Sequence, residues 1–509
     1  MRLREFLTLQ EVEQTQGDLD QEVSGLAYDS RQVARGEVFF AVPGETLDGH
    51  RFVAQALERG AAAVVVEHDA VWPAGTTWIR VGKVRAAMGL WSAHFHGRPS
   101  RRLKLVGITG TNGKTTTSFL VEAILAAAAL DPGVIGTINY RFRGSETPSH
   151  HTTPESIDLH ALLAAMARDG AKSAVLEVSS HALVQERVRA VDFDVGLFTN
   201  LSRDHLDYHK DMNDYFAAKS RLFTDYLPAS AKPAKAAVIY GDDARGPELL
   251  EKARAAGLAT WSYGRHGHWD VKPLQVRTSV GGLSGQIKVK GRVIDFSSAL
   301  IGSANLENIL GAVGVGFALG LPESAIVEGI AKLKNVPGRL EKIDNPLGGA
   351  VVVDYAHTPD ALEKVLGAVR PLTSGRILTV FGCGGDRDPG KRPIMGEIAA
   401  RLSDIVILTS DNPRSEDPQR IIHDIESGVR KIGIPRLETG SAAPPSRPGY
   451  GVEPDRREAI RLALAWAQPG DLILLAGKGH EDYQILGTQK IHFDDREIAR
   501  ELLTHEASR

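Results

Sequence analysis

Continuous apolar runs, rather than alternating apolar and polar positions, mark the strand-like segments in the middle of this chain. An unbroken run of four to eight residues is typical of a parallel strand that is buried on both faces of its sheet. We therefore expect a parallel sheet built from "LKLVGIT" (103–109), "SAVLEVSS" (173–180), "DVGLFTNL" (194–201) and "KAAVIYGDD" (235–243).

The C-terminal part of the chain contains runs of the same kind, with helical patterns between them. Strands that alternate with helices are typical of a doubly wound α/β sheet. The strands expected here are "AVVVDYAHT" (350–358), "RILTVFGCGG" (376–385), "DIVILTSDNPR" (404–414) and "DLILLAGKGHE" (471–481).

The region before these two parts differs from both of them. It holds short strand-like pieces, such as "EVFFAV" (37–42), and ends in a polar stretch, "HGRPSRR" (96–102), which we interpret as a linker. A chain of 509 residues is also too long for one hydrophobic core. We therefore predict three α/β domains, with boundaries at 1–102, 103–340 and 341–509.

The composition excludes several classes of protein. The formal net charge is −3, so no basic field favours nucleic acid as a partner. Cys383 is the single cysteine, which excludes an intrachain disulfide and fits a reducing cytoplasm. No run approaches the ~20 apolar residues that span a bilayer, and the N-terminus lacks a signal-peptide pattern. We expect a cytoplasmic monomer that is not embedded in a membrane.

Polar clusters follow the apolar runs directly. In open α/β sheets, ligands bind outside the carboxyl ends of the strands, so these clusters predict one binding face on each sheet. The clusters are Thr199-Asn200, Asp354-Tyr355-Ala356-His357, Gly384-Gly385-Asp386-Arg387, Asp411-Asn412-Pro413-Arg414 and Lys478-Gly479-His480-Glu481.

A glycine-rich loop, "GTNGKTTT", follows the run at 103–109 and precedes a helical pattern. The common P-loop has the spacing G-x-x-x-x-G-K-[ST], yet this chain has Ile108 where the first glycine is expected. The order strand, glycine loop, helix still predicts an anion site made of backbone N–H groups and a helix N-terminus. We expect Lys114 to neutralise phosphate charge and the Thr115 hydroxyl to reach Mg²⁺.

Glu177 is a further candidate for the metal, and two histidines have the spacing of a zinc site. Glu177 ends an apolar strand, where a carboxylate can hold Mg²⁺ directly or through water. His205 and His209 have the H-x-x-x-H spacing of a zinc pair, but a third ligand is not in view. We therefore interpret His209 as an ordinary polar histidine.

Taken together, these motifs resemble the Mur ligase superfamily, the ATP-dependent amide ligases of peptidoglycan assembly. The resemblance implies a small N-terminal UDP-binding α/β domain, a central P-loop ATPase-like parallel-sheet domain and a C-terminal Rossmann-like doubly wound domain. Besides the glycine loop, it rests on "EVSSHALVQERV" (177–188), "FTNLSRDHLDYH" (198–209), "YFAAKSRLF" (215–223), "GSANLENI" (302–309), "PGRLE" (337–341), "DYAHTPDAL" (354–362), "GCGGDRDPGKRP" (382–393), "SDNPRSEDP" (410–418) and "GKGHEDYQ" (477–484).

The resemblance implies roles for residues that handle ATP and magnesium. Lys114, Glu177, His205 and Lys219 would be catalytic, and Lys219 matches the lysine that the family carries as a CO₂-derived carbamate. The metal set would be Thr115, Glu177, His205 and Lys219. The ATP set would be Gly110, Thr111, Asn112, Gly113, Lys114, Thr115, Thr116, Asn305, Arg339 and Asp354.

The resemblance also implies where a UDP-muramoyl-dipeptide would bind. The family's usual asparagine before two threonines is His151 in this chain, so that contact differs. The implied set is Tyr28, Ser30, Glu45, Thr46, Leu47, His151, Thr152, Thr153, Ser179, Gln185 and Arg187.

The motif "DNPR" (411–414) indicates which amino acid is added. Family members that add meso-2,6-diaminopimelate have this arginine, and lysine-adding relatives lack it. Diaminopimelate carries a far carboxylate that a forked guanidinium reads well, whereas lysine presents a cation there. The implied set is Arg387, Asp411, Asn412, Pro413, Arg414, Gly477 and Glu481.

Several alternatives stay open at this point. A lysine-adding ligase and a folylpolyglutamate synthetase-like ligase share the superfamily. A P-loop NTPase without ligase activity is a reading of another class, and a nucleotide-binding scaffold is a non-enzymatic one. The expected activity is an ADP-forming ligase that joins diaminopimelate to the D-Glu of UDP-N-acetylmuramoyl-L-alanyl-D-glutamate through an acyl phosphate.

Overall fold

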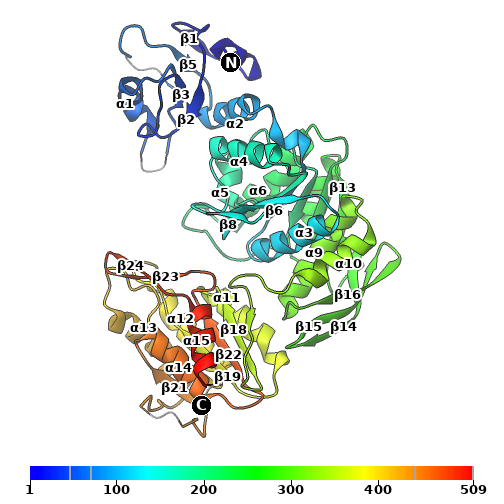
Figure 1. Cartoon of the computed structure of the whole chain (residues 1–509), viewed down its shortest axis with the longest axis vertical. Coiled ribbons are helices and arrows are strands. Elements are labelled where there is room, and N and C mark those ends of the chain that lie inside the picture. Colours follow the sequence, from blue (N-terminus) through cyan, green and yellow to red (C-terminus); the bar gives the residue numbers. More distant parts are fainter. Residues whose placement is uncertain (45–46, 69–71, 441–442, 507–509) are drawn as a thin grey trace. The chain divides into compact units, whose positions relative to one another are not determined.

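A computed structural model describes residues 1–44, 47–68, 72–440 and 443–506 (Figure 1). The chain falls into two compact units, and each consists of several segments. The first unit comprises Met1–Lys272, Lys288–Arg292 and Asn308–Gly329, and the second comprises Pro273–Ile287, Val293–Glu307 and Ile330–Arg509.

A five-stranded sheet forms the N-terminal part of the first unit. Three consecutive apolar residues end strand β3, and two of them, Phe39 and Phe40, are buried in two different cores. Trp91 of α2 packs in the core with Phe40, and Val53 of α1 packs in the core with Phe39. The strand order is β1(Gln14–Gln16)-β5(Trp78–Arg80)-β4(Ala63–Val66)-β3(Glu37–Phe40)-β2(Gly25–Ala27), with short helices η1(Leu3–Glu5), η2(Leu7–Leu9), η3(Gly49–Phe52), α1(Val53–Glu58) and α2(Val84–Phe95).

A second, larger sheet carries the glycine loop, and it confirms the expectation of parallel strands. Strands β13 to β7 run parallel in the order below, and β8 and β9 continue the sheet as antiparallel strands. The order is β13(Ala259–Tyr263)-β12(Ala236–Tyr240)-β11(Val195–Phe198)-β6(Lys104–Thr109)-β10(Ser173–Glu177)-β7(Pro132–Ile135)-β8(Asn139–Phe142)-β9(Ser145–Pro148).

Helices cover both faces of this sheet, and Figure 1 shows α3 and α4 on opposite sides of β6. On the face of α4, Leu163 packs in one core with Leu105 and Leu176 of the strands. On α9, a Cβ added to Gly314 would lie 2.8 Å from Val238, so this helix packs closely on β12. The helices are α3(Lys114–Ala127), α4(Ser156–Arg168), α5(Ser180–Val184), α6(Met212–Arg221), η5(Leu222–Tyr226), α7(Leu227–Ala229), α8(Gly246–Ala255), α9(Ser303–Ala318) and α10(Glu323–Lys332).

The polar stretch at 96–102 is more ordered than a plain linker. It contains the 3-10 helix η4 (Pro99–Arg102), in which Ser100 is fully buried. The hydroxyl of Ser100 accepts a hydrogen bond from the backbone N–H of Asp192 at 3.0 Å, and Arg101 pairs with the Asp192 carboxylate at 3.1 Å. This connection is therefore anchored to the second sheet by polar contacts that its composition alone does not reveal.

The second unit contains the doubly wound sheet that the C-terminal runs predict. Strand β17 is antiparallel and the other five strands are parallel. One core holds Leu362, Met395 and Ile425 from α11, α12 and α13, and another holds Ile460 and Leu503 from α14 and α15. The order is β17(Glu341–Ile343)-β18(Ala350–Asp354)-β22(Leu472–Ala476)-β19(Ile377–Phe381)-β20(Ile405–Leu408)-β21(Gly449–Val452).

The remaining helices of this unit surround that sheet, and the other strands lie outside it. Strands β23 and β24 pair as an antiparallel hairpin. The helices are α11(Pro359–Val369), η6(Arg370–Leu372), α12(Lys391–Leu402), α13(Pro418–Ile432), α14(Arg456–Trp466) and α15(Asp495–Glu506), and the other strands are β14(Val271–Ser279), β15(Gly282–Val289), β16(Arg292–Ser298), β23(Tyr483–Leu486) and β24(Gln489–His492). Strands β14, β15 and β16 belong to the larger sheet, in the order β16-β15-β14-β13.

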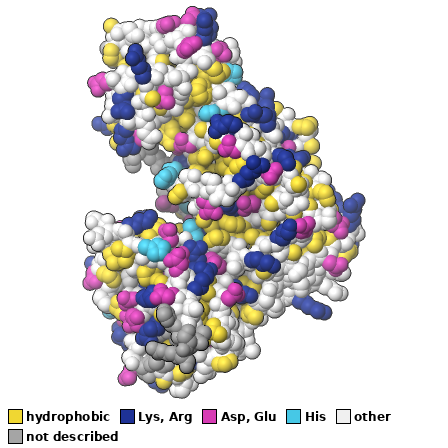
Figure 2. Space-filling model, viewed as in Figure 1, with side chains coloured by type: hydrophobic (Ala, Val, Ile, Leu, Met, Phe, Trp, Pro, Cys, Tyr) yellow, Lys and Arg dark blue, Asp and Glu magenta, His cyan; other side chains and the backbone are white. Residues whose placement is uncertain are grey.

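Charged side chains of both signs are interspersed over the face drawn in Figure 2. This mixing agrees with the formal net charge of −3. Within the described part of the chain, no helix has both the length and the apolar character needed to cross a bilayer.

A buried ion pair generates a prediction about stability. Arg456 of α14 donates to both carboxylate oxygens of Asp495 in α15, at 2.8 and 2.6 Å, and both side chains are fully buried. We expect Asp495→Ala to lower the free energy of unfolding of the second unit by about 3–5 kcal/mol, because the guanidinium stays buried without its partner. Urea denaturation followed by circular dichroism measures this loss.

The neighbouring pair of Arg457 and Glu501 supplies the control for that measurement. Both side chains are well exposed, so Arg457→Ala should cost less than about 1 kcal/mol. Equal losses in Asp495→Ala and Arg457→Ala would contradict the importance of the buried pair.

Candidate active site

The glycine loop occupies only four residues between β6, which ends at Thr109, and α3, which begins at Lys114. Gly110 and Gly113 have φ angles of +143° and +85°, a region that side chains disfavour. A Cβ on Gly110 would lie 1.9 Å from Thr199 Oγ1. Ile108 is fully buried within β6, so the position where a longer P-loop has its first glycine belongs to the sheet.

Two lysine amines meet at this loop. Lys114 Nζ donates to the carbonyls of Gly110 and Thr111, both at 2.9 Å, and Lys219 Nζ donates to the Gly110 carbonyl at 2.8 Å. Burial, followed by the nearby charge of Lys114, holds the pKa of Lys219 well below its ordinary value. Positive charge and a readily deprotonated amine therefore lie beside the same turn.

Two further residues of the expected ATP set have defined surroundings. Thr116 is buried within the first turn of α3, and the carbonyl of Asn112 accepts a hydrogen bond from Asn200 Nδ2.

Glu177, at the end of β10, is the centre of a hydroxyl network. Its carboxylate is 1% exposed and accepts from Thr115 Oγ1 at 3.1 Å and from Thr137 Oγ1 at 2.8 Å. Ser118 Oγ and the Thr137 backbone N–H, both at 3.3 Å, are further donors. Carboxylate and hydroxyl oxygens are ligands that Mg²⁺ accepts, so Thr115 and Glu177 fit the expected cation.

Thr137 is a site residue that the sequence interpretation missed. Its hydroxyl also lies 3.1 Å from Thr152 Oγ1, and Thr153 Oγ1 donates to the Glu177 carbonyl at 2.8 Å. Thr152 and Thr153, which are expected at the dipeptide, are therefore linked by hydrogen bonds to Glu177, which is expected to bind magnesium. Thr137 follows β7 by two residues, so the rule that polar residues follow strands would have found it.

The histidines near this network have separate surroundings. His209 is 2% exposed; its Nε2 lies 2.9 Å from Ser180 Oγ and its Nδ1 lies 3.3 Å from Asp214 Oδ2. Both nitrogens thus have protein partners, which agrees with the structural interpretation of His209. His205 has a φ of +52° and its ring centroid lies 5.0 Å from that of His181. Burial lowers the pKa of His205, so its neutral, metal-binding form is favoured.

The Arg187 guanidinium contacts three acceptors. It donates to the Thr153 carbonyl at 2.9 Å and to Gln185 Oε1 at 2.7 Å, and it pairs with Glu155 at 3.1 Å. Glu155 also forms an ion pair with Arg85 of α2 at 2.8 Å, so one carboxylate pairs with two arginines. Gln185 Nε2 contacts Tyr208 Oη at 3.4 Å, Ser179 caps α5 by accepting from Ala182 N, and the His151 side chain is exposed.

The N-terminal residues expected at the UDP-sugar are only partly described. Tyr28 Oη donates to Asp158 Oδ2 of α4 at 2.7 Å, and the buried Ser30 hydroxyl donates to Gln55 Oε1 at 2.7 Å. Leu47 is 58% exposed. Glu45 and Thr46 lie outside the described residues.

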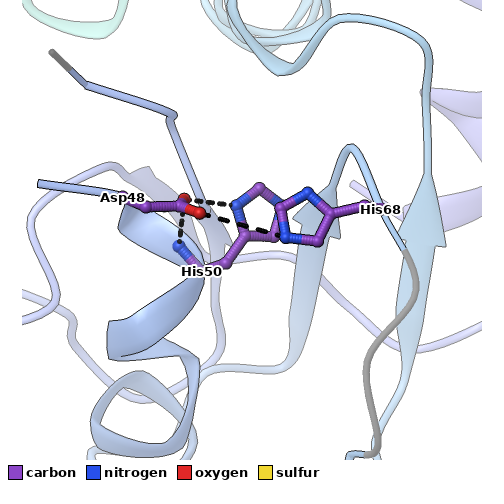
Figure 3. Close-up of side chains that lie close together, drawn as sticks. All are labelled: Asp48, His50 and His68. Carbon is purple, nitrogen blue, oxygen red and sulfur yellow. Dashed lines mark hydrogen bonds and ion pairs between the residues drawn. The ribbon is translucent and has the colours of Figure 1, made fainter.

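Asp48, His50 and His68 lie together near this region and suggest a metal centre at first sight (Figure 3). However, His50 Nε2 accepts the Glu67 backbone N–H at 3.0 Å, so its Nδ1 carries the proton that faces Asp48 Oδ1 at 2.6 Å. Both nitrogens of His50 are therefore occupied. His68 stacks on His50 with ring centroids 3.8 Å apart, and its Nε2 lies 3.9 Å from Asp48. The arrangement is a hydrogen-bonded Asp–His pair rather than a ligand set.

Two of the residues expected at the nucleotide, Asp354 and Arg339, lie near the carboxyl end of β18. Asp354 accepts the backbone N–H groups of Leu340 at 2.8 Å and Ala356 at 2.9 Å, and burial raises the pKa of its carboxyl. The Arg339 guanidinium lies 4.7 Å from the centroid of the Tyr355 ring. Asn305 is buried and its Nδ2 donates to the Ile301 carbonyl at 2.8 Å.

Three strand ends of the second unit converge, as expected of a doubly wound sheet. Lys478 after β22 pairs with Asp411 after β20 at 3.1 Å, and Asn412 Nδ2 donates to Glu481 Oε2 at 3.0 Å. The backbone N–H of Gly477 donates to the Asp354 carbonyl at 3.1 Å. Burial, with the charge of Asp411, raises the pKa of Glu481. Lys478 is fully buried and was recognised in the sequence only as part of a strand-end cluster.

Arg414 lies beside this group and has a φ of +52°. Its Nη1 donates to the Gly385 carbonyl at 2.7 Å, and its backbone N–H donates to Ile485 in β23 at 3.1 Å. Pro413 is buried, whereas Arg387 is exposed and donates to the Asp386 carbonyl at 3.0 Å. The structure therefore brings Asp411, Asn412, Gly477 and Glu481 together and places Arg414 at the next turn of the same loop.

The close approach at Gly110 generates a prediction about ligand binding. We expect Gly110→Ala to abolish measurable ATP binding, because the new methyl group would displace Thr199 and the whole turn. Titration calorimetry with ATP and Mg²⁺ measures the effect. Gly367→Ala is a matched control, since a Cβ there meets no atom within 4 Å and alanine favours the helix. Undiminished ATP binding in Gly110→Ala would contradict the phosphate site.

Comparisons with known proteins identify the family of this chain. Three descriptions match successive parts of the chain: "Mur ligase family, catalytic domain" over residues 22–96, "Mur ligase middle domain" over 108–316 and "Mur ligase, glutamate ligase domain" over 338–479. The UDP-N-acetylmuramoyl-L-alanyl-D-glutamate--2,6-diaminopimelate ligase of Geobacter metallireducens is 51% identical over 503 residues, which cover 98% of this chain and 97% of the relative.

Solved structures show the same fold. A structure of UDP-N-acetylmuramoyl-L-alanyl-D-glutamate--2,6-diaminopimelate ligase has a TM-score of 0.73 and 33% identity, and the match covers 99% of each chain. MurF from Acinetobacter baumannii has a TM-score of 0.63 at 19% identity, covering 99% of this chain and 98% of that one, which supports the fold alone. With relatives of this identity over nearly its whole length, the chain belongs to the Mur ligase family.

Proposed function

We propose that this chain is an ADP-forming ligase that adds meso-2,6-diaminopimelate to the D-Glu of UDP-N-acetylmuramoyl-L-alanyl-D-glutamate, a step of peptidoglycan precursor synthesis. One observation carries the choice of amino acid: a carboxylate (Glu481) is hydrogen-bonded to Asn412, and a guanidinium (Arg414) follows Asn412 by two residues in the same loop. A zwitterionic amino acid with an extra carboxylate complements such a group. The name of the relative at 51% identity supports the same reaction.

The first unit supports ATP as the source of activation. The loop at Gly110–Gly113, the N-terminus of α3 and Lys114 form an anion site. Thr115 and Glu177 would hold Mg²⁺, with His205 and Lys219 as further candidates. When bound, the ion would offset the charge of the phosphate oxygens.

The reaction follows from these parts in two steps. A carboxylate oxygen of the D-Glu residue attacks the γ-phosphorus of ATP, the bond to the β-phosphate oxygen breaks, and ADP leaves. The amine of diaminopimelate then attacks the acyl carbon, inorganic phosphate leaves, and the nitrogen loses a proton to form the amide. Lys114 neutralises phosphate charge, and Arg187, with Thr152, Thr153, Ser179 and Gln185, orients the dipeptide.

We also propose that Lys219 is carbamylated in the working enzyme. The lysine is 2% exposed and its pKa is held well below the ordinary value, so the neutral amine that reacts with CO₂ is available. The amine nitrogen bonds to the carbon of CO₂ and releases one proton to solvent, which leaves an anion. That anion would replace a buried neutral amine beside the glycine loop.

We also propose which part of the chain binds each substrate. Residues 1–102 would bind the UDP-sugar, 103–340 would bind ATP, and 341–509 would bind the amino acid. The ranges of the three family matches support these boundaries. We further propose that the enzyme works as a monomer in the cytoplasm, where ATP and UDP-linked precursors are available.

One assay tests the reaction and separates it from the alternatives. The protein is incubated with ATP, Mg²⁺, the UDP-dipeptide and either meso-diaminopimelate or L-lysine, and ADP and tripeptide are measured. We expect tripeptide only with diaminopimelate, and ADP only when both acceptor substrates are present. Equal turnover with lysine would contradict the specificity, and ADP formation without an acceptor would favour an NTPase.

Arg414 provides a sharper prediction. Arg414→Ala should raise the KM for diaminopimelate roughly 10- to 100-fold, because the far carboxylate loses a charged, forked hydrogen bond. The KM for ATP should stay within about twofold. Steady-state kinetics with each substrate varied in turn measures both values, and a selective loss of ATP affinity would contradict this role for Arg414.

The carbamate is tested on the protein itself. Native mass spectrometry in bicarbonate should detect one added CO₂ on the wild type, and Lys219→Arg should lack it because its guanidinium stays protonated. Activity should fall when CO₂ is removed and return when bicarbonate is restored. An unmodified Lys219 in fully active, CO₂-exposed enzyme would contradict the proposal.

A further inference from the structure

The loop that carries Arg414 is held in a conformation that an arginine disfavours. Its φ of +52° lies in the left-handed region, where non-glycine residues persist only when their surroundings constrain them. On one side, the β23–β24 hairpin fixes the backbone: Arg414 N–H donates to Ile485 at 3.1 Å, and Gly487 N–H donates to the Arg414 carbonyl at 2.8 Å. These bonds hold the main chain but do not direct the side chain.

The loop after β19 holds the other side. Asp386 also has a left-handed φ, +53°, and its carboxylate receives both the hydroxyl of Ser415 at 2.6 Å and the backbone N–H of Ser415 at 3.2 Å. The carbonyl of the preceding residue, Gly385, accepts Arg414 Nη1 at 2.7 Å. The turn at Gly385 and Asp386 therefore binds both the Arg414 guanidinium and the next residue, Ser415.

A third contact anchors this turn to the interior. The backbone N–H of Asp386 donates to Glu416 Oε1 at 2.6 Å, and Arg392 donates to the same oxygen at 2.8 Å. Arg392 is 1% exposed and also donates to Asp424 at 3.0 Å. The two loops also approach closely, since a Cβ on Gly385 would lie 1.9 Å from the Pro413 carbonyl.

From this geometry we propose that Asp386 is a positioning residue that sets the direction of the Arg414 guanidinium, and so sets the preference for an amino acid with a second carboxylate. This inference rests on the proposed function of Arg414. Asp386 would act through Arg414 and would not touch the substrate. Without its carboxylate, Ser415 loses two bonds, the turn relaxes toward ordinary backbone angles, and the guanidinium must be ordered by the substrate itself.

The test compares Asp386→Ala, Ser415→Ala and the double variant in the full-length enzyme. Asp386→Ala should raise the KM for diaminopimelate roughly tenfold while the KM values for ATP and the UDP-dipeptide stay within about twofold. Ser415→Ala should raise the same KM by a smaller factor, because its backbone N–H still reaches Asp386. The double variant should be no worse than Asp386→Ala, since both changes remove parts of one interaction.

Asp388→Ala is the matched control, because this nearby exposed carboxylate accepts only the Gly390 backbone N–H among its hydrogen bonds described here, at 2.8 Å. It should leave the KM for diaminopimelate unchanged. Asp386→Asn keeps one acceptor for the Ser415 hydroxyl and should recover part of the loss. A further readout is the rate ratio of diaminopimelate to lysine, which should fall in Asp386→Ala and stay constant in Asp388→Ala.

Different results overturn different claims. If the wild type fails to form tripeptide or does not prefer diaminopimelate, the proposed function fails. If the wild type is selective but Asp386→Ala keeps its KM and selectivity, or raises all three KM values equally, the positioning role of Asp386 fails. Thermal unfolding of each variant identifies a general loss of folding, which would lower kcat and Tm without changing the selectivity.

Discussion

The arrangement of the site in the first unit depends on the hydrogen bonds made by one buried carboxylate, that of Glu177. A carboxylate that is 1% exposed must be stabilised by donors, and here hydroxyl groups from α3 and from the turn after β7 supply the hydrogen bonds. The Thr137 hydroxyl also lies within hydrogen-bond distance of the Thr152 hydroxyl, and the Glu177 carbonyl accepts a hydrogen bond from Thr153. One strand end therefore sets the positions of the helix proposed to bind phosphate and of the threonines proposed to bind the dipeptide.

The second unit uses the same principle with charges of both signs. Asp411, Lys478 and Glu481 are buried or half-buried at neighbouring strand ends, and Asn412 contacts both Lys478 and Glu481. Such a group is ordered before any ligand arrives, which reduces the entropy that binding must overcome. Arg414 extends this group, but its left-handed backbone needs support from two further loops.

The order of apolar runs and polar clusters was enough to predict most of the fold. Strands β6, β10, β11 and β12, and strands β18, β19, β20 and β22, lie where continuous apolar runs predicted parallel strands. The runs succeed because a strand buried on both faces must be apolar at every position. The polar stretch at 96–102 was less informative: Ser100 and Asp192 bond across distant segments, and composition does not encode such partners.

The sequence by itself determined the family, the α/β class and the residue types of the site, because each of these depends on local patterns and on motifs that follow one another in the order of the family. Only the tertiary structure decided which residues are partners. In the structure, Thr137 is bonded to Glu177, Glu155 pairs with two arginines, and Asp386 is bonded to Ser415. Both nitrogens of His50 also have protein partners. The physical reason is that a hydrogen bond depends on a distance of about 3 Å between two atoms, and most of these partners come from separate segments of the chain.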